Sequence, residues 1–276
     1  MNKAVLRRGK ICEETMKHIW MSILLTALLA GPSTGATIIV GGSNGTVASL
    51  DTSANTILGS YDAGPAWFDI AVNNTGDVYG TTGQALYSID VANEAMGLRL
   101  GNHSFVNSLA FDDSDVLFGA GGGNLYTLDL ATGSSNLVGA VGGNFNSSGD
   151  IAFDQKGKLF ASSLSGCEGG SDCLFSIDTS TGVGSAIGPI GYNNVYGLAR
   201  IGGTLFGLTE ANQLLSIDTL SGSGTLLGSY SINGLTYGAA VPSNVSVVPV
   251  PASILLLLAG IGTLCTLRLQ PRSRKT

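Results

Sequence analysis

Cysteine is the residue type whose spacing most directly indicates chemistry in this sequence. Cys167 and Cys173 enclose a short glycine-rich loop, Glu168-Gly169-Gly170-Ser171-Asp172. In an oxidising compartment we expect them to form a disulfide, since closing a loop of about seven residues stabilises a fold by roughly 2 kcal/mol in the chain-entropy model. A redox or metal role is the alternative, but no histidine or further cysteine stands near. Cys12 and Cys265 lie in terminal segments that we expect to be removed.

The sequence contains few histidine or serine residues in patterns that indicate catalysis. Of the two histidines, His18 lies in the expected signal peptide, so the mature body keeps His103 as its one general base of that type and has no His-based metal cluster. Gly41-Gly42-Ser43-Asn44-Gly45 matches the pattern of a hydrolase nucleophile elbow, which requires a strand-to-helix turn. Strands are expected on both sides here, and Asn44-Gly45 is typical of a hairpin. We therefore predict no catalytic residue and no cofactor.

Aspartates recur at the ends of five similar strands. Most are followed by Thr, Ser or Gly, as expected of a carboxylate that caps its own turn, although a ring of ligands is the alternative. The five are Asp51, Asp90, Asp129, Asp178 and Asp218.

The densest acidic stretch is Asp112-Asp113-Ser114-Asp115. It lacks the spacing and the terminal glutamate of a calcium loop. Asp112, Asp113 and Asp115 are therefore kept only as a calcium candidate, and no other metal site is predicted.

The strands that carry these five aspartates define a repeat. They read Val47 to Asp51, Leu86 to Asp90, Leu125 to Asp129, Leu174 to Asp178 and Leu214 to Asp218, and successive aspartates are 39, 39, 49 and 40 residues apart. This period is typical of propeller blades. Each unit contains four short β-rich runs separated by turn residues, and both faces of the runs are apolar or small. We predict an all-β, five-bladed propeller of four-stranded antiparallel blades, with a β-solenoid or a sandwich as the alternatives.

The phase of the repeat predicts how the ring closes. The last unit stops after Gly234-Leu235-Thr236-Tyr237-Gly238, which matches the first strand of a blade. Ile38-Ile39-Val40-Gly41 matches the strand that should follow. The fifth blade should therefore combine three strands from residues 38 to 61 with one from 232 to 238, which leaves no exposed sheet edges for aggregation. The propeller domain is predicted to span residues 37–241.

Composition and charge limit the class of partner. The chain is 44% hydrophobic and 12% charged, so it should fold into a globular body. Residues 37–251 carry 17 acidic residues against four basic ones, Arg99, Lys156, Lys158 and Arg200. Such a field repels phosphate backbones, so nucleic acid is not expected as a partner.

Residues 1–36 have the three parts of a secretory signal. A basic region ends at Lys17, an apolar run extends from residue 19 to 30, and small residues lead to Ala36. We expect signal peptidase to cleave after Ala36. Met16 would itself open a signal of ordinary length and is an alternative start. An uncleaved N-terminal membrane helix is the other interpretation.

The C-terminus has a matching organisation. Residues 242–251 form a linker with a Pro-x-Pro motif, and residues 252–276 contain an apolar run and a basic tail. About 16 apolar residues are near the lower limit for a transmembrane helix, and the basic tail would stay on the cytoplasmic side. A plain membrane anchor is one interpretation.

The last 28 or so residues resemble the PEP-CTERM sorting signal of exported bacterial proteins, which an exosortase reads. The resemblance rests on Pro249-Val250-Pro251, the single apolar helix and the Arg-rich end, with Arg268, Arg272 and Arg274. Val250 replaces the usual glutamate, in a Val-Pro-x-Pro-Ala-Ser form that is similar to a variant of the signal. The resemblance implies an envelope or extracellular destination, with transient anchoring in the inner membrane before the tail is removed.

These features together predict an exported binding or structural component of the bacterial envelope or extracellular matrix. Extracellular polysaccharide or an envelope protein is the expected class of partner. The alternative is a secreted carbohydrate-active hydrolase or lyase, which would need two carboxylates about 5 to 10 Å apart in a cleft, one with a raised pKa. A calcium-dependent adhesive protein is a third possibility.

Overall fold

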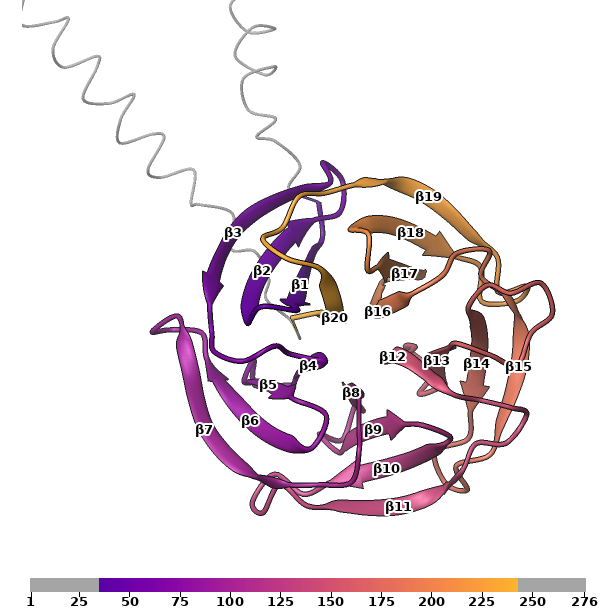
Figure 1. The fold of residues 1–276 in the computed structure, drawn as a ribbon, viewed down its shortest axis with the longest axis horizontal. Coiled ribbons are helices and arrows are strands. Elements are labelled where there is room, and N and C mark those ends of the chain that lie inside the picture. The colour runs from indigo at the N-terminus through magenta and orange to yellow at the C-terminus, as the bar shows by residue number, and fades with distance from the viewer. Residues whose placement is uncertain (1–34, 243–276) are drawn as a thin grey trace, which may run out of the picture.

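A computed structural model describes residues 35–242, which form a closed ring of five four-stranded antiparallel sheets (Figure 1). The five-bladed propeller predicted from the repeat is therefore confirmed. The expected signal helix and C-terminal transmembrane helix fall almost entirely outside the described residues. Within residues 35–242, no helix has the length and hydropathy needed to span a bilayer.

The blades are numbered in chain order, and each has one strand at the channel and one at the rim (Figure 1). From the channel outward, blade 1 is β4 (Asp69–Val72), β5 (Val78–Thr81), β6 (Ala85–Asp90) and β7 (Ala95–Asn102); blade 2 is β8 (Ser108–Phe111), β9 (Leu117–Gly121), β10 (Asn124–Leu128) and β11 (Ser135–Ala140); blade 3 is β12 (Ser147–Phe153), β13 (Leu159–Ser163), β14 (Cys173–Ile177) and β15 (Gly184–Pro189); blade 4 is β16 (Val195–Ile201), β17 (Thr204–Thr209), β18 (Gln213–Ile217) and β19 (Gly224–Ser229); blade 5 is β20 (Thr236–Ala240), β1 (Thr37–Gly42), β2 (Thr46–Asp51) and β3 (Thr56–Asp62).

Blade 5 joins the two ends of the described chain, as the phase of the repeat predicts. β1 pairs antiparallel with β20, with Val40 opposite Ala239 and Gly41 opposite Gly238. The C-terminal strand starts and ends two or more residues later than expected. The residues before it form a loop in which the Leu235 carbonyl accepts the Ser43 amide, so pairing with β1 begins only at Thr236.

The hydrophobic core is divided into five clusters, and each cluster lies between two neighbouring blades. In one of them, Leu125 of blade 2 packs in the same cluster as Leu159 and Phe175 of blade 3, and all three are fully buried. Because each sheet buries both faces, its strands are apolar on both sides rather than alternating. This explains why the sequence lacks the polar face that a half-exposed sheet would show.

Neighbouring blades also interlock at the rim. A glycine stands at the same register of the outer strand in four blades, opposite Leu86, Leu125, Leu174 and Leu214. A Cβ added to Gly139 would collide with the Thr181 carbonyl, in the aspartate-capped turn of the next blade. Gly182 of that turn has a φ of 78° and lies against Gly139 in return. The repeated glycine therefore permits close backbone contact between blades.

This interlock predicts different effects for two glycine-to-alanine changes on outer strands. Gly139→Ala should destabilise the fold by about 1–3 kcal/mol, since the turn of blade 3 must move away. Gly59→Ala is the matched control, because a Cβ there meets nothing within 4 Å; it should change stability by less than about 0.5 kcal/mol. Urea unfolding of the two variants measures the difference. Equal stabilities would show that the rim contact is not tight.

Candidate functional site

The inner strands place five backbone N–H groups at the channel. An inner strand is the edge of its sheet, so these groups have no neighbouring strand to pair with. They belong to the same position of each blade: Ile70, Leu109, Ile151, Leu198 and Ala239. All five donate hydrogen bonds to only two side chains, Asp69 and Asp150.

Asp69 and Asp150, the carboxyl pair, divide the five donors between them. Asp69 accepts the Ile70 amide at 2.7 Å through Oδ1 and the Leu109 amide through Oδ2. Asp150 accepts the Ile151 amide at 2.6 Å through Oδ1, and its Oδ2 accepts the amides of Leu198 and, at 3.2 Å, Ala239. Both aspartates are fully buried.

The carboxyl pair also shares a hydrogen bond, which requires a proton between the two groups. Burial raises the pKa of both carboxyls well above the ordinary aspartate value, and the Asp150 charge further raises the pKa of Asp69. The hydrogen bond from Asp69 and the backbone amides favour the ionised form of Asp150. Burial and the contact between the two carboxyls therefore favour a protonated form of the pair at pH values where an exposed aspartate is ionised.

The remaining blades leave room for this pair. Gly238 and Gly197 stand where blades 1 and 3 carry aspartate, and a Cβ at Gly238 would collide with Asp69. Two carboxyl groups in direct contact do not have the roughly 5 to 9.5 Å separation of a glycosidase pair. The carboxyl pair is therefore a structural closure of the channel. The sequence analysis did not single it out, although an acidic residue at the same position of two apolar inner strands was a visible signal.

A pocket of about 220 Å³ lies next to the carboxyl pair, and Phe68 and Gly149, which directly precede Asp69 and Asp150, are among the residues that line it. We call it the aromatic pocket; it is lined by Phe68, Phe105, Asn107, Ser148, Gly149, Tyr196, Glu210 and Tyr237. Each blade contributes the residue that lies two positions before its channel-facing amide, and three of these residues are aromatic: Phe68, Tyr196 and Tyr237. The ring centroids of Tyr196 and Tyr237 are 5.8 Å apart, and those of Tyr237 and Phe68 are 6.2 Å apart.

Two side chains of the aromatic pocket, Asn107 and Glu210, have acceptor oxygens with capacity to spare. Asn107 uses its Nδ2 on the carbonyls of Ser147 and Ser148, which leaves its buried Oδ1 without a hydrogen-bond partner. Glu210 accepts one hydrogen bond, from Asn194 at 2.8 Å. The pKa of Tyr196 is raised, first by burial and then by the charges of Glu210 and Asp172. The pocket is thus electronegative and suited to a ligand that donates hydrogen bonds.

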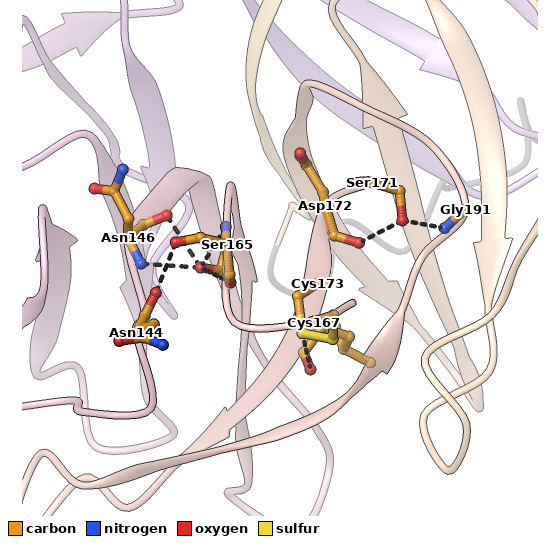
Figure 2. The surroundings of a disulfide bond; sticks show 10 residues. Asn144, Asn146, Ser165, Cys167, Ser171, Asp172, Cys173 and Gly191 are labelled. Carbon is orange, nitrogen blue, oxygen red and sulfur yellow. Dashed lines mark hydrogen bonds between the residues drawn. A yellow bond between two sulfur atoms is a disulfide. The ribbon is translucent and has the colours of Figure 1, made fainter. Parts of the chain in front are cut away.

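The predicted cysteine pair lies in blade 3. Cys167 and Cys173 form a disulfide with their Cα atoms 5.4 Å apart, in the loop between β13 and β14 (Figure 2). Asp172, which directly precedes Cys173, accepts hydrogen bonds from the Ser148 hydroxyl at 2.6 Å and from the Val195 amide at 2.7 Å. Burial raises the pKa of Asp172. The disulfide loop therefore positions a carboxyl that ties blade 3 to blade 4 beside the aromatic pocket.

The loop itself is held by hydrogen bonds to neighbouring loops, which Figure 2 shows. The Ser165 hydroxyl donates to the Asn144 carbonyl at 2.6 Å, and the Ser171 hydroxyl accepts the Gly191 amide at 3.1 Å. Cys173 is fully buried in the core between blades 2 and 3. The disulfide is therefore part of the packed structure of blade 3.

The five strand-ending aspartates cap their turns, as interpreted from the sequence. Asp178, for example, accepts hydrogen bonds from the Ser180 hydroxyl and amide and from the Thr181 amide. The Ser180 hydroxyl is the largest of the causes that lower the pKa of Asp178. Equivalent hydrogen bonds surround the other four, Asp51, Asp90, Asp129 and Asp218.

The calcium candidate does not converge on one point. Asp112 Oδ1 accepts the amides of its own turn, from Ser114 and Val116, and Asp115 Oδ1 accepts the Asn74 amide of blade 1. Asp112 and Asp113 line a second cavity of about 250 Å³ at the opposite mouth, beyond the carboxyl pair. In the part of the chain that the structure describes, no group of three or more His, Cys, Asp or Glu side chains is arranged to hold a metal.

Ser43 and His103 also have structural contacts. Ser43 lies in the hairpin between β1 and β2, where its hydroxyl accepts the Leu235 amide at 3.1 Å, so the strand-to-helix turn of a nucleophile elbow is absent at this position. His103 lies 3.2 Å from the Thr81 hydroxyl through Nε2 and 2.6 Å from the Ser104 carbonyl through Nδ1. Neither lines the aromatic pocket.

Comparison with known proteins finds similarity at the level of fold. No protein-family model and no curated protein matches the sequence. A solved structure described under the de novo evolutionary emergence of a symmetrical protein is 16% identical, with a TM-score of 0.50 over 75% of this chain and 98% of that one. A protein of unknown function from Bacteroides caccae is 12% identical (TM-score 0.42, 70% of this chain, 72% of that one). A protein of unknown function from Bacteroides thetaiotaomicron VPI-5482 is 13% identical (TM-score 0.49, 77% and 66%).

Proposed function

We propose that this protein is an exported, surface-associated binding module of the bacterial envelope or extracellular matrix, and that the aromatic pocket is its ligand site. The observation that carries this proposal is the blind pocket itself. Aromatic rings from three neighbouring blades line one side of the channel mouth, and the carboxyl pair closes the channel one residue below. Concave sites with apolar walls and a few fixed polar groups are the usual form of small-ligand sites.

Extracellular polysaccharide is the ligand class that this pocket suits. A glycosyl ring presents C–H groups that pack on aromatic faces and hydroxyls that need hydrogen-bond acceptors. Phe68, Tyr196 and Tyr237 supply the first kind of contact, and Asn107 Oδ1 and Glu210 supply the second. The pocket is smaller than the roughly 300–1,000 Å³ of drug-sized sites, so it fits a single unit of a polymer.

A secreted hydrolase or lyase is the second candidate, because Glu210 and Asp172 both raise the pKa of Tyr196 in the pocket, and the pKa of Asp172 is itself raised. Asp172 does not line the pocket, however, and its Oδ2 already accepts two hydrogen bonds. An acid of a catalytic pair must reach the substrate. The arrangement therefore favours binding over hydrolysis.

Export is supported by the two ends of the chain and by the disulfide. Disulfides persist in oxidising compartments outside the cytoplasm. The signal-like segment ending at Ala36 and the PEP-CTERM-like segment from Pro249 onward would direct the propeller across the inner membrane and then to an exosortase.

Binding can be tested with purified full-length protein and extracellular polysaccharide fractions. Tyr237→Ala should weaken binding at least about tenfold, a loss of roughly 1.4 kcal/mol, because the central ring of the three is removed. Tyr126→Ala is the matched control, since this half-buried tyrosine lies on β10 outside the pocket. Melting curves establish that both variants fold. Equal binding by the two variants would contradict the proposal.

Export can be tested by mass determination of the mature chain from cells with and without the cognate exosortase. We expect the mature chain to begin at Thr37 and to lack the basic tail only when the exosortase is present. The double change Pro249→Ala and Pro251→Ala should leave the tail attached in the membrane fraction. A chain that keeps residues 255–276 in every fraction of exosortase-positive cells would contradict the sorting proposal.

A further inference from the structure

We propose that the aromatic pocket selects a positively charged glycosyl unit, namely a hexosamine whose amino group is free rather than acetylated. This inference rests on the proposed function and specifies its ligand. A free amino sugar carries an ammonium group, several hydroxyl donors and an apolar ring face. The pocket offers a complementary feature for each of these three.

The electrostatic environment favours a cation. Glu210 is the one charged residue that lines the pocket. Among the described residues, the four basic side chains stand elsewhere: Arg200 lines the opposite cavity, Lys156 and Lys158 lie in the turn after β12, and Arg99 lies on the outer strand β7. An ammonium group entering the pocket therefore meets a carboxylate and no competing cation, which favours it over a neutral or anionic ligand.

The hydrogen-bonding pattern calls for donors on the ligand. The two carbonyls that accept from Asn107 Nδ2 fix the orientation of this amide, so Oδ1 is the atom left unpaired. A buried acceptor without a donor destabilises the protein, and a ligand O–H or N–H would remove that cost. Glu210 likewise uses Oε2 on Asn194 and can accept a further donor.

The three neighbouring rings form a continuous aromatic wall of the pocket. Tyr237 lies between Tyr196 and Phe68, with centroid separations of 5.8 and 6.2 Å and interplanar angles of 74° and 77°. An aromatic ring attracts a cation that stands over its face within roughly 6 Å of the centroid, so an ammonium group over the face of one of these rings would gain that attraction. Gly149 lines the pocket without a side chain, and a Cβ there would stand 3.0 Å from the Tyr196 Cα, so the glycine lets Tyr196 pack closely against blade 3.

The test compares three ligands of similar length on the full-length protein by calorimetry at pH 6: fully de-N-acetylated chitotriose, its triacetylated form, and cellotriose. We expect the de-N-acetylated ligand to bind at least about tenfold more tightly than the other two. Glu210→Gln should reduce this preference to less than about threefold while the variant still folds. Glu94→Gln, which removes an equal charge from an exposed turn outside the pocket, should leave the preference unchanged.

Each other result decides against the inference in a recognisable way. Equal binding of the three ligands, or a preference for the acetylated form, overturns the charge selection but leaves the binding module intact if Tyr237→Ala abolishes binding. Full competition by tetramethylammonium at equal concentration overturns the requirement for a sugar. Failure of these ligands and of every polysaccharide fraction to bind overturns the proposed function itself.

Discussion

The structure depends on one constraint: a closed propeller directs backbone N–H groups into a channel where no strand can accept them. Five such groups, one from each blade, meet two carboxyl side chains, and Asp69 and Asp150 together accept all five. Each buried N–H left without a partner would cost roughly 1–3 kcal/mol. Burial raises the pKa of both carboxyls well above the ordinary aspartate value, so the centre of the fold contains a pair of acids that favours the protonated state.

The carboxyl pair breaks the fivefold symmetry of the repeat, because only blades 1 and 3 contribute an aspartate to it. Blade 5 cannot carry an acid at this position, because a Cβ at Gly238 would collide with Asp69. Asp150 of blade 3 accepts the amide of Ala239, so the carboxyl pair also ties down the strand that closes the ring. With the channel closed, the residues one position earlier form a blind pocket rather than a pore, and their variation among blades gives it an aromatic side and a polar side.

The local features were predictable from the sequence, whereas those that depend on ring closure were not. The turn aspartates, such as Asp178, act within a few residues of themselves, and the cysteine pair encloses its own loop. The pairing of Gly41 with Gly238 follows from the phase of the repeat. The contact between Asp69 and Asp150, and the meeting of Tyr196, Tyr237 and Phe68, exist only once five blades surround one axis. Sequence spacing alone does not show which position of an inner strand lies there.

The shared proton can be measured most directly through the pH dependence of stability. An unfolded aspartate has a pKa near 3.8, whereas burial raises the pKa of both folded carboxyls well above that value. The native state therefore binds more protons than the unfolded state between pH 5 and 8, and the free energy of unfolding should fall as pH rises, by up to about 1.4 kcal/mol per pH unit. Asp69→Asn, whose amide can donate to Asp150 without titrating, should reduce this slope. A wild-type free energy of unfolding that is constant or rises over this range would contradict the account.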